Sequence, residues 1–140
     1  MHIYNVTIIK VIDGDTVKVD IDLGFDMVLR NQNIRLFGID APESRTKNPL
    51  EKKYGLMTKE VVESAMPVGS IQQMVSTKSG KGKFGRILGE FLVKDSEISN
   101  QRYNLNKWLI ENHYAVEYTG MGSRDNLNEQ HKMNREILDK

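Results

Sequence analysis

The sequence has no cysteine, which rules out disulfide bonds and thiolate metal sites. No apolar run approaches the roughly 20 residues that a membrane-spanning helix needs, so we expect no membrane partner. The first residues also lack the pattern of an export signal, a basic segment followed by an apolar one and a cleavage site. As the sequence stands, we therefore expect a cytoplasmic protein; a signal already removed from the chain would make it a secreted one.

The chain has almost no net charge, because 20 basic and 19 acidic side chains nearly cancel. Their distribution is uneven. Residues 1–44 carry four basic and seven acidic side chains, residues 45–86 nine and three, and residues 87–140 seven and nine. A basic central segment after an acidic one suits a groove for a polyanion beside a cation site. A basic loop and helix exposed to solvent would produce the same counts, so both interpretations stay open.

Length and composition are those of one compact domain, and we expect residues 1–140 to form it. Alternating or apolar runs predict strands over residues 2–12, 15–22, 27–40, 70–77 and 85–94. Apolar residues at helical spacing predict helices over residues 56–66, 100–112 and 123–138, and residues 44–55 form a polar loop. Five short strands, with a helix between the third and fourth, are typical of a small closed barrel. We therefore expect an α+β fold, mainly β: a five-stranded OB-fold barrel with three helices.

The segment VIDGDTVKV, residues 11–19, places Asp13, Gly14 and Asp15 between two apolar runs. Asp-Gly between such runs indicates a hairpin, because glycine accepts the positive φ of a primed turn. The turn explains Asp13 and Gly14. It does not explain Asp15, which would begin the second strand although aspartate is a poor strand former. The presence of an aspartate at position 15 therefore needs an explanation other than the turn.

A second segment, IRLFGIDAPE at residues 34–43, gathers an arginine, an aspartate and a glutamate at the end of an apolar strand. In a plain strand Arg35 and Asp40 would face opposite sides, so they converge only if the strand bends, and Gly38 is the natural place for a bend. Pro42 then turns the chain out of the sheet. The alternative is a simple strand exit with polar residues in solvent.

A third segment, KGKFGRILGEFLVK at residues 81–94, places Arg86 at the start of an apolar strand and after two lysines. A hairpin with a basic turn explains this pattern. It is also typical of an arginine that binds a phosphate through two parallel hydrogen bonds, with nearby lysines as additional positive charges. The histidines, by contrast, show no spacing typical of metal ligands, and we expect solvated side chains for His2, His113 and His131.

Together these segments resemble the staphylococcal nuclease family. The resemblance rests on five blocks in the family's order and similar spacing: IDGDTVKV at 12–19, IRLFGIDAPE at 34–43, EKKYG at 51–55, KFGR at 83–86 and NEQH at 128–131. It implies an OB barrel and a calcium-dependent nuclease that hydrolyses the phosphodiester bonds of DNA and RNA with low sequence specificity. We expect the protein to be a monomer. The same fold also occurs as repeats that have lost the site residues, so a non-catalytic nucleic-acid-binding module is the alternative.

Carried over residue by residue, the resemblance implies a Ca²⁺ site. Asp15, Asp40 and the backbone carbonyl of Ala41 would be its ligands, and Asp13 would lie behind them. Calcium takes six to eight oxygen ligands, so these groups fill only part of its coordination shell and leave places for water and a phosphate oxygen. We therefore expect weak calcium binding by the free protein and stronger binding when a nucleotide is present.

The resemblance also implies the groups that act on the substrate. Arg35 and Arg86 would hold the scissile phosphate, and Glu43 would orient or deprotonate the attacking water. Two arginines and a cation aimed at the phosphate stabilise the more negative transition state more than the ground state. The residues expected to contact the nucleic acid are Lys81, Lys83, Tyr114 and Tyr118. For the two tyrosines, packing in the core is an equally good interpretation.

Overall fold

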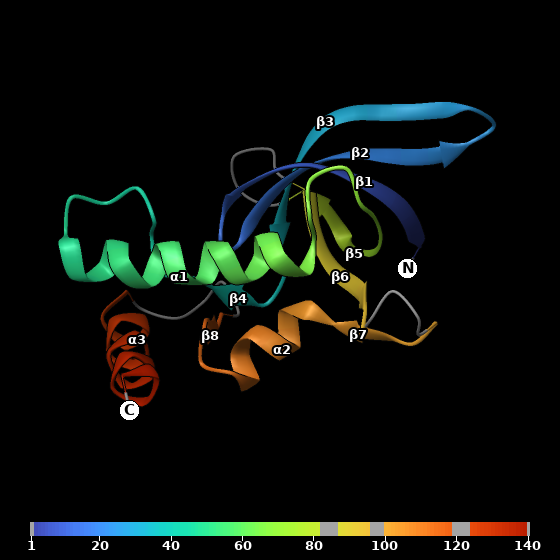
Figure 1. Ribbon diagram of the computed structural model, residues 1–140. Helices are drawn as coiled ribbons and strands as arrows, with labels where there is room; N and C mark the ends of the chain where they lie inside the picture. The colour runs from blue at the N-terminus through green and yellow to red at the C-terminus, as the bar shows by residue number, and fades with distance from the viewer. Residues whose placement is uncertain (1, 82–86, 96–99, 119–123, 140) are drawn as a thin grey trace.

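The computed structural model describes residues 2–81, 87–95, 100–118 and 124–139 (Figure 1). The elements are β1 (Ile3–Asp13), β2 (Thr16–Gly24), β3 (Met27–Leu36), β4 (Ile39–Asp40), α1 (Pro49–Ala65), β5 (Ile71–Lys81), β6 (Ile87–Lys94), β7 (Arg102–Asn104), α2 (Leu105–Glu111), β8 (Val116–Glu117) and α3 (Arg124–Leu138). Helix α3 lies beside the N-terminal half of α1 (Figure 1). In the described residues, no helix is long and apolar enough to cross a membrane.

Five of the strands close into a barrel. The main sheet has the order β3-β2-β1-β5-β6-β7, and β3 also pairs with β6. This closing pair is parallel and joins residues 34–36 to residues 87–89, whereas the other barrel pairs are antiparallel. Within the described ranges, a closed barrel of five strands with three helices confirms the predicted OB-type fold, α+β and mainly β.

Aliphatic side chains that alternate along the strands fill the barrel. On β2, Val17, Val19 and Ile21 are buried, whereas the residues between them are more exposed. Helices α1 and α2 complete this core with Val62, Leu105 and Leu109, together with Met66, the C-cap of α1. Because such interiors are close-packed, the barrel is a rigid base for the segments that leave its strands.

The predicted strand over residues 27–40 is divided in two. β3 ends at Leu36, and β4 begins at Ile39 after a turn in which Gly38 has a φ of +83°. Glycine suits this position because other residues rarely adopt a positive φ. β4 then pairs with β8. The bend that the sequence predicts at Gly38 is therefore present.

Helix α1 begins at Pro49 and not at residue 56, so the predicted loop over residues 44–55 is half helical. Its N-cap is Asn48, whose side chain accepts hydrogen bonds from the backbone N–H groups of Leu50 and Glu51. Proline is favoured in the first turn, where its missing N–H has no intrahelical partner to lose. Asn48 followed by Pro49 is a sequence signal for the start of a helix. We predicted a loop here because the residues that follow are mostly polar.

The turn between β1 and β2 is not the predicted primed turn. Gly14 and Asp15 form it, and neither residue has a positive φ. Asp15 therefore lies in the turn and not at the start of the second strand. Gly14 is needed for a different reason, because a Cβ there would lie 2.6 Å from Cγ2 of Thr58 and 3.1 Å from Cβ of Ala41. The turn is pressed against α1 and against the chain that leaves β4.

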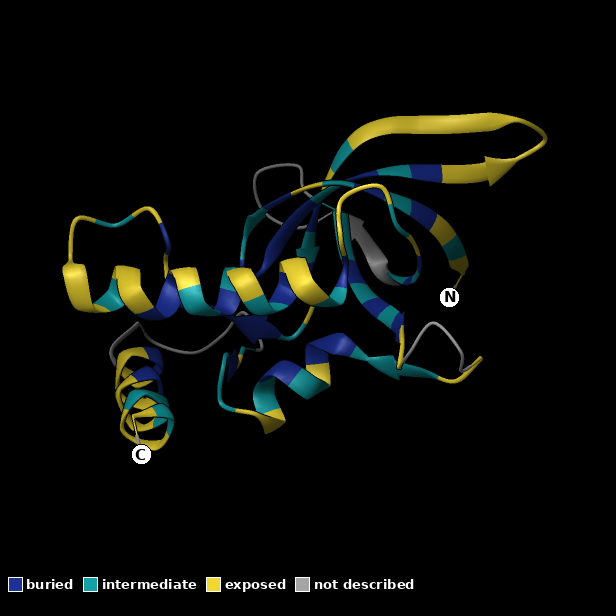
Figure 2. Cartoon of the chain, viewed as in Figure 1, coloured by how far each residue is buried: buried dark blue, intermediate teal, exposed yellow. Residues whose placement is uncertain are grey.

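At their far ends, β2 and β3 extend beyond the barrel as an exposed hairpin (Figure 2). Its turn residues, Phe25 and Asp26, both have positive φ, as a type I′ turn requires. This tip lies at the opposite end of β2 from Asp15. The hairpin is therefore remote from the polar side chains described next.

Candidate active site

The candidate site lies where the β1–β2 turn meets the end of β3. Thr16 pairs with Arg35 in the β2–β3 register, which places the arginine beside Asp15. Beyond the bend at Gly38, Asp40 reaches the same guanidinium. Nη1 of Arg35 is 2.8 Å from Oδ2 of Asp15, and its Nη2 is 3.5 Å from Oδ1 of Asp40. The structure thus brings together Asp15, Arg35 and Asp40, which we call the Arg35 cluster.

The two carboxylates of the Arg35 cluster are buried, and Arg35 is partly buried. Asp15 and Asp40 are 9% and 8% exposed. Burial alone lowers the pKa of Arg35, but Asp15 and Asp40 outweigh this effect, so the net pKa of the guanidinium is raised and it stays charged. Taken by themselves, two carboxylates and one guanidinium have a formal charge of −1. Carboxylate oxygens are also the ligands that hard cations prefer.

Asp15 and Arg35 also hold the chain where it leaves β4. Oδ2 of Asp15 accepts a hydrogen bond from the N–H of Ala41 at 3.0 Å. Nη2 of Arg35 donates to the carbonyl of Ile39 at 3.2 Å. These bonds join the turn, the arginine and the strand exit into one unit, and they fix the residue whose carbonyl is the predicted third calcium ligand.

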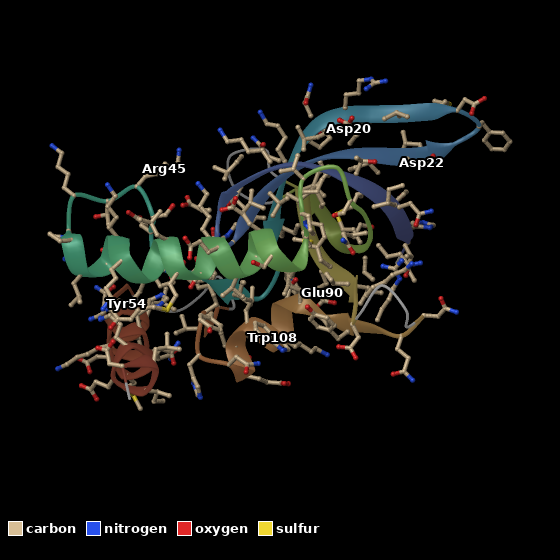
Figure 3. All side chains as sticks on the ribbon, in the orientation of Figure 1. Asp20, Asp22, Arg45, Tyr54, Glu90 and Trp108 are labelled. Atoms are coloured by element: carbon tan, nitrogen blue, oxygen red, sulfur yellow. The ribbon has the colours of Figure 1, made fainter. Side chains whose placement is uncertain are left out.

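Asp13 contacts the segment that carries Glu43. Its Oδ1 accepts a hydrogen bond from the Ser44 hydroxyl, and its Oδ2 lies 3.3 Å from Nη2 of Arg45, which is labelled in Figure 3. The side chain of Glu43 is exposed. Its backbone packs on α1 so closely that a Cβ at Gly55 would lie 2.3 Å from the Glu43 carbonyl oxygen. Asp13 and Gly55 thus hold the Glu43 segment against the turn and the helix.

His131 is buried, and the prediction that its side chain is solvated is wrong. Its Nε2 lies 2.8 Å from Oδ2 of Asp40, the oxygen that does not face Arg35. Sequence reasoning missed this contact because α3 is mostly polar. Leu127 is also buried and lies one helical turn earlier, so the four-residue spacing of Leu127 and His131 was the signal for a buried face.

The two predicted base-contacting tyrosines have different surroundings. Tyr118 lies close to the cluster, with its ring centroid 5.8 Å from Cζ of Arg35. Tyr114 is stacked on Trp108, with ring centroids 5.8 Å apart and an angle of 14° between the planes, and it packs against the hydrophobic core. Tyr118 is therefore near the candidate site, and Tyr114 has the environment of a core residue.

The basic segment before β6 is described only at its first residue. Lys81 ends β5 and pairs with Ile87 of β6, and its side chain is not described. Lys83 and Arg86 lie outside the described residues. The roles of these three residues stay predictions.

The donor set of the Arg35 cluster suits a hard cation. Asp15 and Asp40 offer carboxylate oxygens, which calcium prefers. Among the described residues, no group of three or more His, Cys, Asp or Glu side chains is placed to hold a metal ion. A cation here would take its remaining ligands from backbone, water or substrate, and the weak calcium binding expected from the sequence stays a prediction.

Helix α3 is tied to α1 by a hydrogen bond from the Tyr54 hydroxyl to Asp139; Tyr54 lies on the side of α1 that faces α3 (Figure 3). This hydrogen bond, together with burial, raises the pKa of Tyr54 above its ordinary value of 10. The unfolded chain therefore loses the proton first, so the contribution to stability is complete below pH 10 and is lost as the pH rises through the folded pKa.

We expect Tyr54→Phe to lower the thermal unfolding midpoint at neutral pH, and its difference from the unchanged protein to shrink above pH 10. Circular dichroism melts across this range measure both effects. A difference that stays constant through the alkaline range would contradict the assignment of the hydrogen bond to a neutral tyrosine.

Comparison with known proteins gives one family. Residues 33–136 match the family model described as staphylococcal nuclease homologue. No curated protein matches the sequence. The matched region contains Arg35, Asp40 and Glu43, and the turn with Asp13 and Asp15 lies just before it.

Proposed function

The chain belongs to the family of staphylococcal nuclease homologues, and we propose that it is a calcium-dependent nuclease that hydrolyses phosphodiester bonds of DNA and RNA with low sequence specificity. The observation that carries the proposal is the Arg35 cluster, a partly buried arginine between two buried carboxylates at the strand exit before Glu43. A binding module would have no need for this combination. Surface cations would bind the phosphates at a lower cost of desolvation.

Arg35 is the proposed phosphate-binding group on the described part of the chain. A guanidinium has five N–H donors, and its bonds to Asp15, Asp40 and the Ile39 carbonyl leave donors for a phosphate. Because the carboxylates fix the plane of the guanidinium, its donors need no reorganisation as negative charge develops. Arg86 is proposed to supply a second guanidinium.

Glu43 is the proposed group that orients or deprotonates the attacking water. Its side chain is exposed, so it is accessible to water and substrate, while its backbone is fixed against α1. A positioned carboxylate can accept a proton from water in the transition state. In this proposal Asp13 acts on the same step, because its bond to Ser44 holds the residue next to Glu43.

The proposed calcium ligands are Asp15, Asp40 and the Ala41 carbonyl. When bound there, Ca²⁺ supplies positive charge beside the phosphate oxygens. The ring of Tyr118 is proposed to contact a nucleotide base, because stacking on an aromatic ring tolerates any base. Lys81 and Lys83 are proposed to contact neighbouring phosphates.

The proposal is tested by incubating the purified protein with single-stranded DNA and Ca²⁺, with and without a chelator. We expect cleavage that the chelator abolishes, and Glu43→Gln should slow it by about a hundredfold or more, because general base catalysis contributes at least that factor. Glu60→Gln is the matched control, since Glu60 is an exposed glutamate on α1, and it should cleave normally. DNA that stays intact with calcium, magnesium and manganese would exclude a nuclease and leave the binding module.

A further inference from the structure

His131 makes a buried polar contact that the proposed reaction has not used. Its side chain is 6% exposed and that of Asp40 is 12% exposed, and 2.8 Å separates Nε2 from Oδ2. The oxygen of an ionised carboxylate only accepts hydrogen bonds, so Nε2 carries the hydrogen and donates it. A helix near the end of the chain thus reaches the Arg35 cluster through one side chain.

This contact divides the two oxygens of Asp40 between two structural elements. Oδ1 faces Nη2 of Arg35, on the barrel, and Oδ2 accepts from His131, on α3. Fixing both oxygens fixes the rotation of the carboxylate about its side-chain bonds. Asp40 needs such support because β4 is only two residues long. Carboxylates that bind metals are themselves commonly oriented by hydrogen bonds of this kind.

His131 is not needed merely to attach α3. Leu127 is buried under the helix, and Nδ2 of Asn134 donates to the carbonyl of Ala115 at 3.2 Å. In the described part of the chain, Nδ1 of His131 has no hydrogen-bond partner. A leucine would fill the same space without burying an unpaired ring nitrogen. The polar ring is therefore best explained by its bond to Asp40.

We propose that His131 is a positioning residue, whose Nε2–H holds the Asp40 carboxylate in the orientation in which it binds the cation. The inference rests on the proposed function, because it acts on the same calcium site. It adds a third element, α3, to the turn and the strand exit that build this site. Removal of a hydrogen bond to a ligand typically weakens metal binding by about 10- to 100-fold.

The test is calorimetric titration of Ca²⁺ into the full chain and its variants, with thermal unfolding of each in parallel. His131→Leu should weaken calcium binding by about 10- to 100-fold and raise the calcium concentration for half-maximal DNA cleavage by the same factor. His131→Gln places an amide N–H near the position of Nε2 and should bind calcium within about threefold of the unchanged protein. His131→Asn has the same polarity without the reach, and it should behave like His131→Leu.

Asn134→Ala is the control for helix attachment, because it removes a contact of α3 that does not involve Asp40. It should lower the unfolding midpoint and leave calcium affinity unchanged. Equal losses of affinity in Asn134→Ala and His131→Leu, or no loss in a folded His131→Leu, would overturn the inference. If His131→Leu does not fold, equal affinities for the Gln and Asn variants would overturn it. Absence of calcium binding and cleavage by the unchanged protein would instead refute the proposed function itself.

Discussion

Arg35→Gln is expected to slow cleavage of single-stranded DNA by about a thousandfold, the upper range for loss of one preorganised donor. It is also expected to lower the free energy of unfolding of the cation-free protein by about 3 kcal/mol, because it leaves buried charges without their partner. Both Asp15 and Asp40 are in contact with this guanidinium. Urea unfolding in the presence of chelator and initial cleavage rates measure the two effects.

Calcium should partly reverse the loss of stability in Arg35→Gln. A cation held by Asp15 and Asp40 would replace the positive charge that the substitution removes. The rise of the unfolding midpoint on adding calcium should therefore be larger for Arg35→Gln than for the unchanged protein, since a ligand stabilises the state that it binds more tightly. Activity should not return, because the phosphate still lacks its donor.

Arg30→Gln is the matched control for Arg35→Gln. Arg30 lies on the same strand and pairs with an aspartate of β2, but its side chain is 73% exposed and 3.5 Å from the carboxylate of Asp20. Surface ion pairs of this kind contribute about 0–1 kcal/mol, so stability and cleavage should hardly change. An Arg35→Gln protein as stable and active as Arg30→Gln would contradict the assignment of Arg35.

The strands of the barrel could be predicted because each is marked by a pattern of neighbouring residues in the sequence. Alternating apolar residues mark the strands, and Gly38 marks the bend that brings Asp40 back toward Arg35. The parity of the two residues along the strand showed that they could converge only if the strand bent, and a simple strand exit was the alternative. Their roles toward calcium and phosphate rest on the family resemblance, and the structure supplies the distances and the burial.

Two features that depend on contacts of distant segments with the helices were not predicted. Gly14 read as a turn former, and the structure shows that it is needed for close contact with Thr58 of α1. His131 read as a solvated residue, because the polar composition of α3 hides which face of the helix the fold covers. Gly14 contacts α1, and His131 lies on α3 and contacts Asp40 of β4. Both contacts join segments that are far apart in the sequence, so a local sequence pattern does not reveal them.

Gly55→Ala is expected to destabilise the protein and to slow cleavage, although alanine normally stabilises a helix by about 1 kcal/mol relative to glycine. A Cβ at this position would lie 2.3 Å from the Glu43 carbonyl oxygen and 2.6 Å from the Ser44 nitrogen. The backbone of the Glu43 segment must move to make room, and overpacking of this kind costs about 1–3 kcal/mol. A displacement of about 1 Å at a reacting group can slow a reaction about a hundredfold. Thermal unfolding and cleavage rates measure both.

Two comparisons make the role of Gly55 specific. Ser64→Ala, at an exposed position of α1, should leave stability equal or slightly higher, because alanine has the better helix propensity and nothing obstructs it. In a Glu43→Gln background, Gly55→Ala should cause little further loss of rate, since two changes that act through one residue are not additive. A hundredfold loss that persists in that background would show that Gly55 acts on the site by a route other than Glu43. A Gly55→Ala protein that is more stable and fully active would show that the loop can move away from α1 without cost.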